Sequence, residues 1–271
     1  MNKINSFLLL KDGAEIAYKI DGKVGPPVAL LFGLGGGYQF WNEVSAILSS
    51  NYRVISFDQR GIGSSSRGKF KTSLECLVDD FKQLIDHVFP DQPVNVIGHS
   101  TGGVIAQIFA SRYPEKLSSL VLSGSWFKAD HYMRYLFHLR RTLLNEAPSI
   151  YQSLSNILSY NPAVVCELFW ENFETESSMS DCFRELMTNR IDALINYSGD
   201  GVVEKITLNT LVIGSRDDQV IPFYHQQKLY NALPYGHLTE IKEGGHFFPK
   251  IKAHDYASLV EGWVEDGEKS I

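Results

Sequence analysis

The chain has 271 residues, of which 44% are hydrophobic and 21% are charged, proportions that are ordinary for a globular protein with a substantial core. Its formal net charge of −6 argues against a nucleic acid or an anionic membrane as partner, because both are bound by basic surfaces.

Three features of the sequence bear on the cellular compartment of the protein. The three cysteines, Cys76, Cys166 and Cys182, show no paired spacing, which is typical of a reducing compartment. The first residues lack an apolar stretch long enough for a signal peptide, and no apolar run approaches the length of a membrane span. We therefore expect a cytoplasmic protein that is not embedded in a membrane.

Apolar runs separated by glycine-rich turns predict the first strands. Residues 6–10 and 14–20 flank an Asp-Gly turn, and the continuous apolar run 28–32 is typical of a strand buried on both faces of a parallel sheet. A glycine-rich loop follows at 33–37, without the lysine of a phosphate-binding loop. Helical periodicity then predicts helices at 40–49 and 74–88, on either side of a strand at 52–57.

A short apolar run at 94–97 leads into the pattern G-x-S-x-G at 98–102, and a helix is predicted from 104 to 113. Strand, sharp turn and helix are the context in which this pattern forms a nucleophile elbow, with the Ser100 hydroxyl exposed at the turn. An ordinary glycine-rich turn with an unremarkable serine would look the same. Only the presence of a histidine and an acid in suitable places separates these two interpretations.

The second half of the chain changes character twice. A strand is predicted at 117–122, and residues 127–206 then show helical periodicity with no strand pattern. Strands return at 209–213 and 238–241, alternating with helices at 224–233 and 254–264. We predict an α/β fold: a mostly parallel, eight-stranded sheet with helices on both faces, formed by 1–126 and 207–271, with 127–206 as a helical cap inserted after the sixth strand.

Candidate partners for Ser100 follow the last strands. A serine hydroxyl needs a base that removes its proton, and the base needs an acid that holds it in one tautomer. His246 lies in a Gly-Gly turn just after a predicted strand, and Asp217 and Asp218 follow the strand before it. His225 is the main alternative to His246, whereas His99 is expected to pack within the elbow.

The order Ser, Asp, His is that of the α/β-hydrolases, and the chain resembles this superfamily over nearly its whole length. The loop 32–36 resembles the family's oxyanion loop, with Phe32 in place of the usual histidine, and 58–64 resembles its D-x-R-G-x-G-x-S turn. The resemblance implies Ser100, an aspartate of the 217–218 pair and His246 as the triad. It also implies that the backbone N–H groups of Leu34 and Thr101 form the oxyanion hole.

Within the superfamily the chain looks most similar to 3-oxoadipate enol-lactonases and aminoacrylate hydrolases, which act on small substrates. The turn at 58–61 also resembles that of proline iminopeptidases, but their Gly-Gly-Ser-Trp-Gly elbow is absent here.

The resemblance implies a serine hydrolase that cleaves a small carbonyl substrate, namely a carboxylic ester, a lactone or an amide or carbamate, through an acyl-enzyme. We expect a small-molecule substrate as partner and no metal or organic cofactor, because His and Cys residues are not clustered at ligand spacing. The sequence leaves the oligomeric state open. A carbon–carbon bond hydrolase and a haloperoxidase-like enzyme would use the same triad, and a receptor-like binder with a vestigial triad is a third alternative.

The choice between Asp217 and Asp218 depends on the residue from which positions in the loop after the strand at 209–213 are counted. Counting three residues from Gly214 indicates Asp217. The family's acid usually lies four residues before a proline, and Asp218 is four residues before Pro222. Counting from the start of the strand also indicates Asp218. We therefore favour Asp218 as the acid and expect Asp217 to be a solvated neighbour or to cap the following turn.

Overall fold

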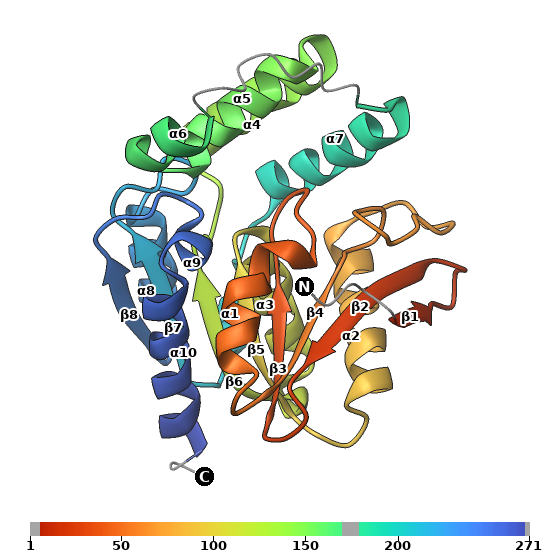
Figure 1. Ribbon diagram of the computed structural model, residues 1–271, viewed down its shortest axis with the longest axis vertical. Helices are drawn as coiled ribbons and strands as arrows, with labels where there is room; N and C mark the ends of the chain where they lie inside the picture. Colours follow the sequence, from red (N-terminus) through yellow and green to blue (C-terminus); the bar gives the residue numbers. More distant parts are fainter. Residues whose placement is uncertain (1–5, 170–178, 269–271) are drawn as a thin grey trace.

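A single eight-stranded sheet is the centre of the computed structural model, which describes residues 6–169 and 179–268 (Figure 1). The strand order is β1-β2-β4-β3-β5-β6-β7-β8; β1 pairs with β2, and β2 with β4, in the antiparallel sense, and the other neighbouring strands run parallel. The strands are β1 (Ser6–Leu9), β2 (Glu15–Asp21), β3 (Pro27–Leu31), β4 (Arg53–Phe57), β5 (Val94–His99), β6 (Leu117–Ser123), β7 (Thr210–Ser215) and β8 (Gly236–Ile241). The predicted mostly parallel α/β sheet is confirmed.

Helices cover both faces of the sheet, because alternate side chains of each buried strand enter different cores. In β5, Ile97 packs into a core with α1 (Asn42–Leu48) and α10 (Ala253–Glu268), whereas Val96 packs into the opposite core. That second core contains side chains of α2 (Leu74–Val88), α3 (Thr101–Arg112) and α8 (Tyr224–Ala232). The continuous apolar runs predicted as central strands are therefore buried on two sides.

Helix α2 shows how local sequence sets the element. Its buried side chains recur at helical spacing, and the Ser73 hydroxyl accepts a hydrogen bond from the N–H of Cys76 at the N-terminus. The buried set on the inner face is Leu77, Val78, Asp80, Phe81, Leu84 and Ile85. The predicted range 74–88 is confirmed.

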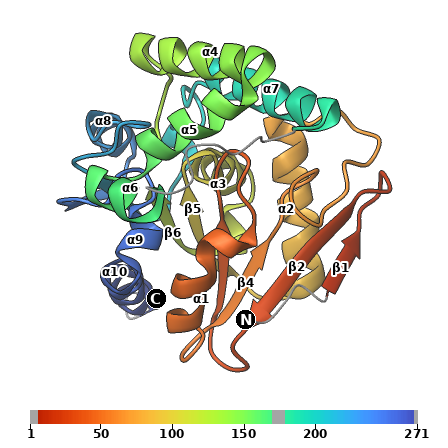
Figure 2. The ribbon, with the colours of Figure 1, turned by 45° about the horizontal axis from the view of Figure 1, so that its top comes forward.

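In the described part of the segment between β6 and β7 there are four α-helices: α4 (His131–Glu146), α5 (Pro148–Ser159), α6 (Pro162–Phe169) and α7 (Asp181–Asn196). We call them the helical insertion. Pro148 is at the start of α5, where a missing N–H costs nothing. An isolated antiparallel bridge between Lys128 and Ser198 closes the base of the insertion. Figures 1 and 2 show the insertion as a layer across one end of the sheet, above α1 and α3.

Among the described residues, no helix is both long enough and apolar enough to cross a bilayer.

Candidate active site

The turn between β5 and α3 holds Ser100 in a strained conformation. Its φ of 57° and ψ of −123° make it the one non-glycine residue with positive φ in the described part of the chain. The turn is tight: a Cβ on Gly98 would lie 2.5 Å from the Gly102 carbonyl oxygen, and one on Gly102 would lie 2.3 Å from that of Leu31. Only glycine fits at either position, as a nucleophile elbow requires.

Helix α3 begins at Thr101, earlier than the predicted start at 104. The two glycines at 102 and 103 weaken the helical pattern in the sequence. In the structure the whole reversal of direction takes place at Ser100, so both glycines are already helical.

His246 and Asp218 form a buried pair next to this turn. His246 Nδ1 donates to Asp218 Oδ2 over 2.8 Å, and each residue is 4% exposed. The other oxygen, Asp218 Oδ1, accepts the N–H groups of Val220 and Ile221, each over 2.8 Å. A carboxylate held on both oxygens orients the imidazole and leaves Nε2 free to accept a proton. The His246 ring centroid is 4.8 Å from that of His99, which precedes Ser100.

Asp217 does not reach His246; it is half-buried, and the turn that it caps is the later one at Gly244 and Gly245, not the turn directly after it. Its carboxylate accepts the N–H groups of Gly244 at 3.1 Å and Gly245 at 2.9 Å, and the Ser215 hydroxyl at 2.6 Å. Burial opposes ionisation of this half-buried group, but these hydrogen bonds outweigh burial and lower the pKa of Asp217. The residue holds the turn that carries His246.

The glycine-rich loop after β3 lies against the elbow. A Cβ on Gly33 would be 3.0 Å from Ser100 Oγ and 3.4 Å from the Thr101 nitrogen, so a glycine is needed for this approach. In the described residues, neither the Leu34 N–H nor the Thr101 N–H donates a hydrogen bond, and both are available to an oxygen of a ligand. The loop is held from below by Gln59, whose Nε2 donates to the Phe32 carbonyl over 2.6 Å.

A cavity of about 220 Å³ lies between this loop and the helical insertion. Leu34, at the proposed oxyanion position, and Phe247, next to His246, line it on the side of the sheet. Residues of α4, α5 and α7 line the other side, among them Arg140, Gln152, Asn156 and Met187. The cavity thus lies between the glycine-rich loop and the insertion, and its lining includes Leu34 and Phe247 but not Ser100, Thr101 or His246.

Comparison with known proteins places this geometry in a family. A family model described as the alpha/beta hydrolase fold matches residues 26–252. The chain belongs to the α/β-hydrolases. It is 28% identical over 253 residues to a protein of Azorhizobium caulinodans named as a candidate carbamate hydrolase, RutD, covering 92% of this chain and 95% of that one. A relative of the same name from Caulobacter vibrioides (strain NA1000 / CB15N) is 30% identical over 242 residues, covering 88% and 90%.

Solved structures show the same fold. The enol-lactonase of Burkholderia xenovorans LB400 superposes with a TM-score of 0.83 at 19% identity, covering 96% of this chain and all of that one. An esterase of Exiguobacterium antarcticum superposes with a TM-score of 0.82 at 20% identity, covering 97% and 100%. These structures show the fold, and the family model together with the named relatives shows that the chain is an α/β-hydrolase enzyme.

Two other histidines near the site of this α/β-hydrolase, His225 and His99, are buried side chains that pack within the fold. His225 is fully buried, its Nε2 is 3.4 Å from Asp130 Oδ1, and burial lowers its pKa despite that carboxylate. It does not pair with Asp218, so the structure favours His246. His99 is also fully buried, with Nδ1 3.2 Å from the Ser123 hydroxyl, which confirms that it packs within the elbow.

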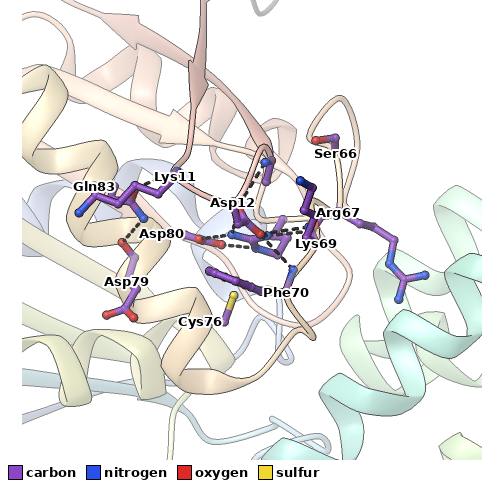
Figure 3. Close-up of polar contacts among 12 residues, drawn as sticks. Lys11, Asp12, Ser66, Arg67, Lys69, Phe70, Cys76, Asp79, Asp80 and Gln83 are labelled. Carbon is purple, nitrogen blue, oxygen red and sulfur yellow. Dashed lines mark hydrogen bonds and ion pairs between the residues drawn. The ribbon is translucent and has the colours of Figure 1, made fainter.

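The D-x-R-G turn of this α/β-hydrolase is a scaffold. Asp58 accepts the N–H groups of Tyr38 and Ser64, both at 2.9 Å, and so joins the oxyanion loop to the turn. Arg60 lies between the carboxylates of Asp12 and Asp80, and its hydrogen bonds hold the pKa of Asp12 well below the ordinary range (Figure 3). Arg60 is 1% exposed and its ion pairs stabilise the turn, and Asp12, Arg60 and Asp80 also lie among the residues that line a separate cavity of about 660 Å³.

Two buried arginines near the site had no signal in the sequence. Arg140 lines the cavity, and Arg190 donates to Gln59, which in turn holds the oxyanion loop. Arg140 and Arg190 lie on amphipathic helices, where the sequence pattern alone suggests solvated side chains. Only packing of the insertion onto the sheet brings them inside.

Proposed function

We propose that this α/β-hydrolase is a serine hydrolase of a small carbonyl substrate, cleaving a carboxylic ester, a lactone or an amide or carbamate. The observation that carries the proposal is the buried Asp218–His246 pair beside the strained turn at Ser100. A hydrogen-bonded acid and base next to a serine on an elbow is the arrangement that activates a hydroxyl.

In the proposed reaction, Ser100 Oγ attacks the substrate carbonyl while His246 Nε2 takes the hydroxyl proton. The negative charge on the carbonyl oxygen is stabilised by the unoccupied N–H groups of Leu34 and Thr101. Collapse of this intermediate expels the leaving group, which receives the proton from His246. Water, activated by the same imidazole, then hydrolyses the acyl-enzyme and restores Ser100. Asp218 keeps its charge and stabilises the imidazolium throughout.

We also propose that 127–206 acts as a cap that limits substrate size, over a core made of 1–126 and 207–271. The cavity of about 220 Å³ is closed on one side by this segment, which favours short acyl groups. The names of the relatives, a candidate carbamate hydrolase, an enol-lactonase and an esterase, are consistent with small substrates. The free cysteines of the chain fit our expectation of a cytoplasmic enzyme.

The first test replaces the nucleophile. Ser100→Ala should abolish labelling by a fluorophosphonate probe and lower kcat on short esters, lactones and carbamates by a factor on the order of 10⁶. Circular dichroism should be unchanged, because the hydroxyl makes no structural hydrogen bond among the described residues. Ser111→Ala, at the other end of the same helix, is the matched control and should label normally. Undiminished turnover by the Ser100 variant would refute the serine mechanism.

The same panel addresses the alternatives that share the triad. A carbon–carbon bond hydrolase would turn over β-diketones faster than esters, and a haloperoxidase-like enzyme would need a peroxide and a halide. A receptor-like binder would bind ligands without turning over any of the panel.

A further inference from the structure

Arg140, on α4, is a buried cation that has no carboxylate partner within 6–169 and 179–268. It is 8% exposed, and among the described residues its guanidinium donates only from Nη2, to the Tyr151 hydroxyl at 3.5 Å and the Ser155 hydroxyl at 3.3 Å. Both distances are at the long end of the hydrogen-bond range, and Nε is buried with no acceptor at all. The neighbouring Arg141, in contrast, pairs with Asp192 at 2.5 Å.

An arginine keeps its charge in any protein environment, and an uncompensated buried charge is strongly unfavourable. Arg60 illustrates the usual solution, with two carboxylates around one guanidinium. The rings of Phe137 and Tyr151 lie 5.1 and 5.4 Å from the Arg140 guanidinium carbon and offset part of the cost. Aromatic faces hold the guanidinium but do not accept its in-plane N–H groups, and in the described part of the chain only Nη2 has an acceptor.

Arg140 belongs to the lining of the cavity beside the glycine-rich loop, although its Nε is itself buried. Arg140 lines it together with Gln152, Ser155 and Asn156 of α5, while Leu34 lines the opposite side. One end of the cavity is therefore cationic and polar, and the other end carries the proposed oxyanion donor. Its volume of about 220 Å³ corresponds to roughly seven water molecules at about 30 Å³ each, which suits a compact ligand.

We propose that Arg140 binds a carboxylate on the substrate, and hence that the enzyme hydrolyses small esters, lactones or amides whose acyl or leaving group carries a second, ionised carboxyl group. One monoanion would neutralise the single guanidinium, whose planar fork matches a carboxylate in two parallel hydrogen bonds. This inference rests on the proposed function for the position of the scissile bond. The binding of the anion at Arg140 does not depend on catalysis.

Binding is tested first, without turnover. Isothermal titration of the intact enzyme with glutarate should show one site, weakened about 10- to 100-fold in Arg140→Met, the range expected for a lost charge-assisted pair. Arg140→Lys should fall between the two, because lysine keeps the charge but loses the fork. Arg141→Met is the matched control: it removes the same charge from the same helix, outside the cavity, and should bind like the wild type.

Turnover is tested with two esters of equal shape, ethyl hydrogen glutarate and ethyl 5-methylhexanoate, in which a carboxylate and an isopropyl group occupy the same end. In Arg140→Met, kcat/KM should fall about 10- to 100-fold for the first and stay level or rise for the second. The melting temperature of the unliganded variant should not fall, since an unpaired buried charge is removed.

Several outcomes would overturn the proposal. Equal losses on both esters, or a lower melting temperature without a change in ester preference, would make Arg140 a structural residue. Inorganic phosphate bound more tightly than glutarate, in an Arg140-dependent manner, would refute a carboxylate as the recognised group. Arg140-dependent glutarate binding with neither ester hydrolysed would support the anion site and count against the proposed function alone.

Discussion

Two adjacent aspartates have separate surroundings, although their chemistry is identical. Asp218 faces inward and pairs with His246, whereas Asp217 faces the turn that carries His246 and accepts two of its backbone N–H groups. Asp218 orients the imidazole ring of His246, and Asp217 positions the backbone of the turn that carries it. Both effects depend on a negative charge, but only the first acts on the ring that serves as the base in the proposed reaction.

Asn substitutions at the two positions should therefore separate these effects. Asp218→Asn should lower kcat on one ester by about 10⁴, because the imidazole can then adopt the wrong tautomer. Asp217→Asn should cost at most about 10²-fold, through a less precisely placed His246, and it should lower stability by about 1–3 kcal/mol. Steady-state kinetics and urea unfolding on both variants are the measurements. A larger kcat loss for Asp217→Asn would reverse the assignment.

Helix α7 connects the insertion to the oxyanion loop. Arg190, 3% exposed, donates to Gln59 Oε1 and to the Arg60 carbonyl, both at 2.8 Å. Gln59 in turn donates to the Phe32 carbonyl at the start of the loop. Burial lowers the pKa of Arg190 to about 10, and the more distant charge of Asp80 opposes this only in part. The helix is thus held to the loop by two consecutive hydrogen bonds through one amide.

Breaking this connection should affect catalysis more than stability. Arg190→Met removes the hydrogen bonds but also an uncompensated buried charge, so the two effects on the free energy of unfolding oppose each other. We expect faster amide hydrogen exchange at 33–37 and a loss of kcat of up to about 10²-fold. Arg184→Met, on the same helix, is the control, because Arg184 pairs with Asp181 one turn away and has no other ion pair among the residues that the structure describes. Unchanged exchange and kcat in Arg190→Met would exclude the proposed coupling.

At the scale of the whole molecule, the pH dependence of stability depends on buried histidines. His99 and His225 are both fully buried, and burial lowers the pKa of each. His99 is surrounded by the Phe40 and Trp41 rings, the Ser123 hydroxyl and the ring of His246. Burial, and then the proximity of His246, hold the pKa of His99 well below its ordinary value of 6.5. In the unfolded chain the same imidazole takes up a proton near pH 6.5. Between these two pKa values the unfolded state therefore binds more protons, and stability falls as the pH decreases.

Stability should accordingly be highest above pH 6.5 and decline as the pH is lowered towards 5. His99 contributes up to about 1.4 kcal/mol per pH unit in this window. Urea unfolding from pH 8 to pH 5 measures the slope, which His99→Phe should reduce by up to that amount. His138→Gln is the control, because that side chain is exposed on α4. A slope that is the same in His99→Phe and the wild type would contradict the assignment.

Local sequence was sufficient to predict the strands of the sheet and the sharp turn at Ser100. Runs such as 28–32 and 94–97 are apolar throughout because they are buried on both faces, and this signal depends on no other part of the chain. The glycines around Ser100 are equally local, since they reflect close contacts within a few residues. The resemblance in motif order then pointed to His246 and favoured Asp218.

Tertiary structure alone decided how the insertion meets the site. The sequence pattern predicts Arg140 and Arg190 to be exposed on amphipathic helices, and their hydrogen-bond partners lie 11 or more positions away in the chain. Gln59 contacts Arg190 across 131 positions of the chain, and Asp217 contacts Gly245 across 28. Hydrogen bonds over such separations depend on the packing of whole elements, and no periodicity or spacing encodes them. The positive charge of Arg140, which we propose selects the substrate, can therefore be assigned to the site only from the packing of α4 and α5 over the glycine-rich loop.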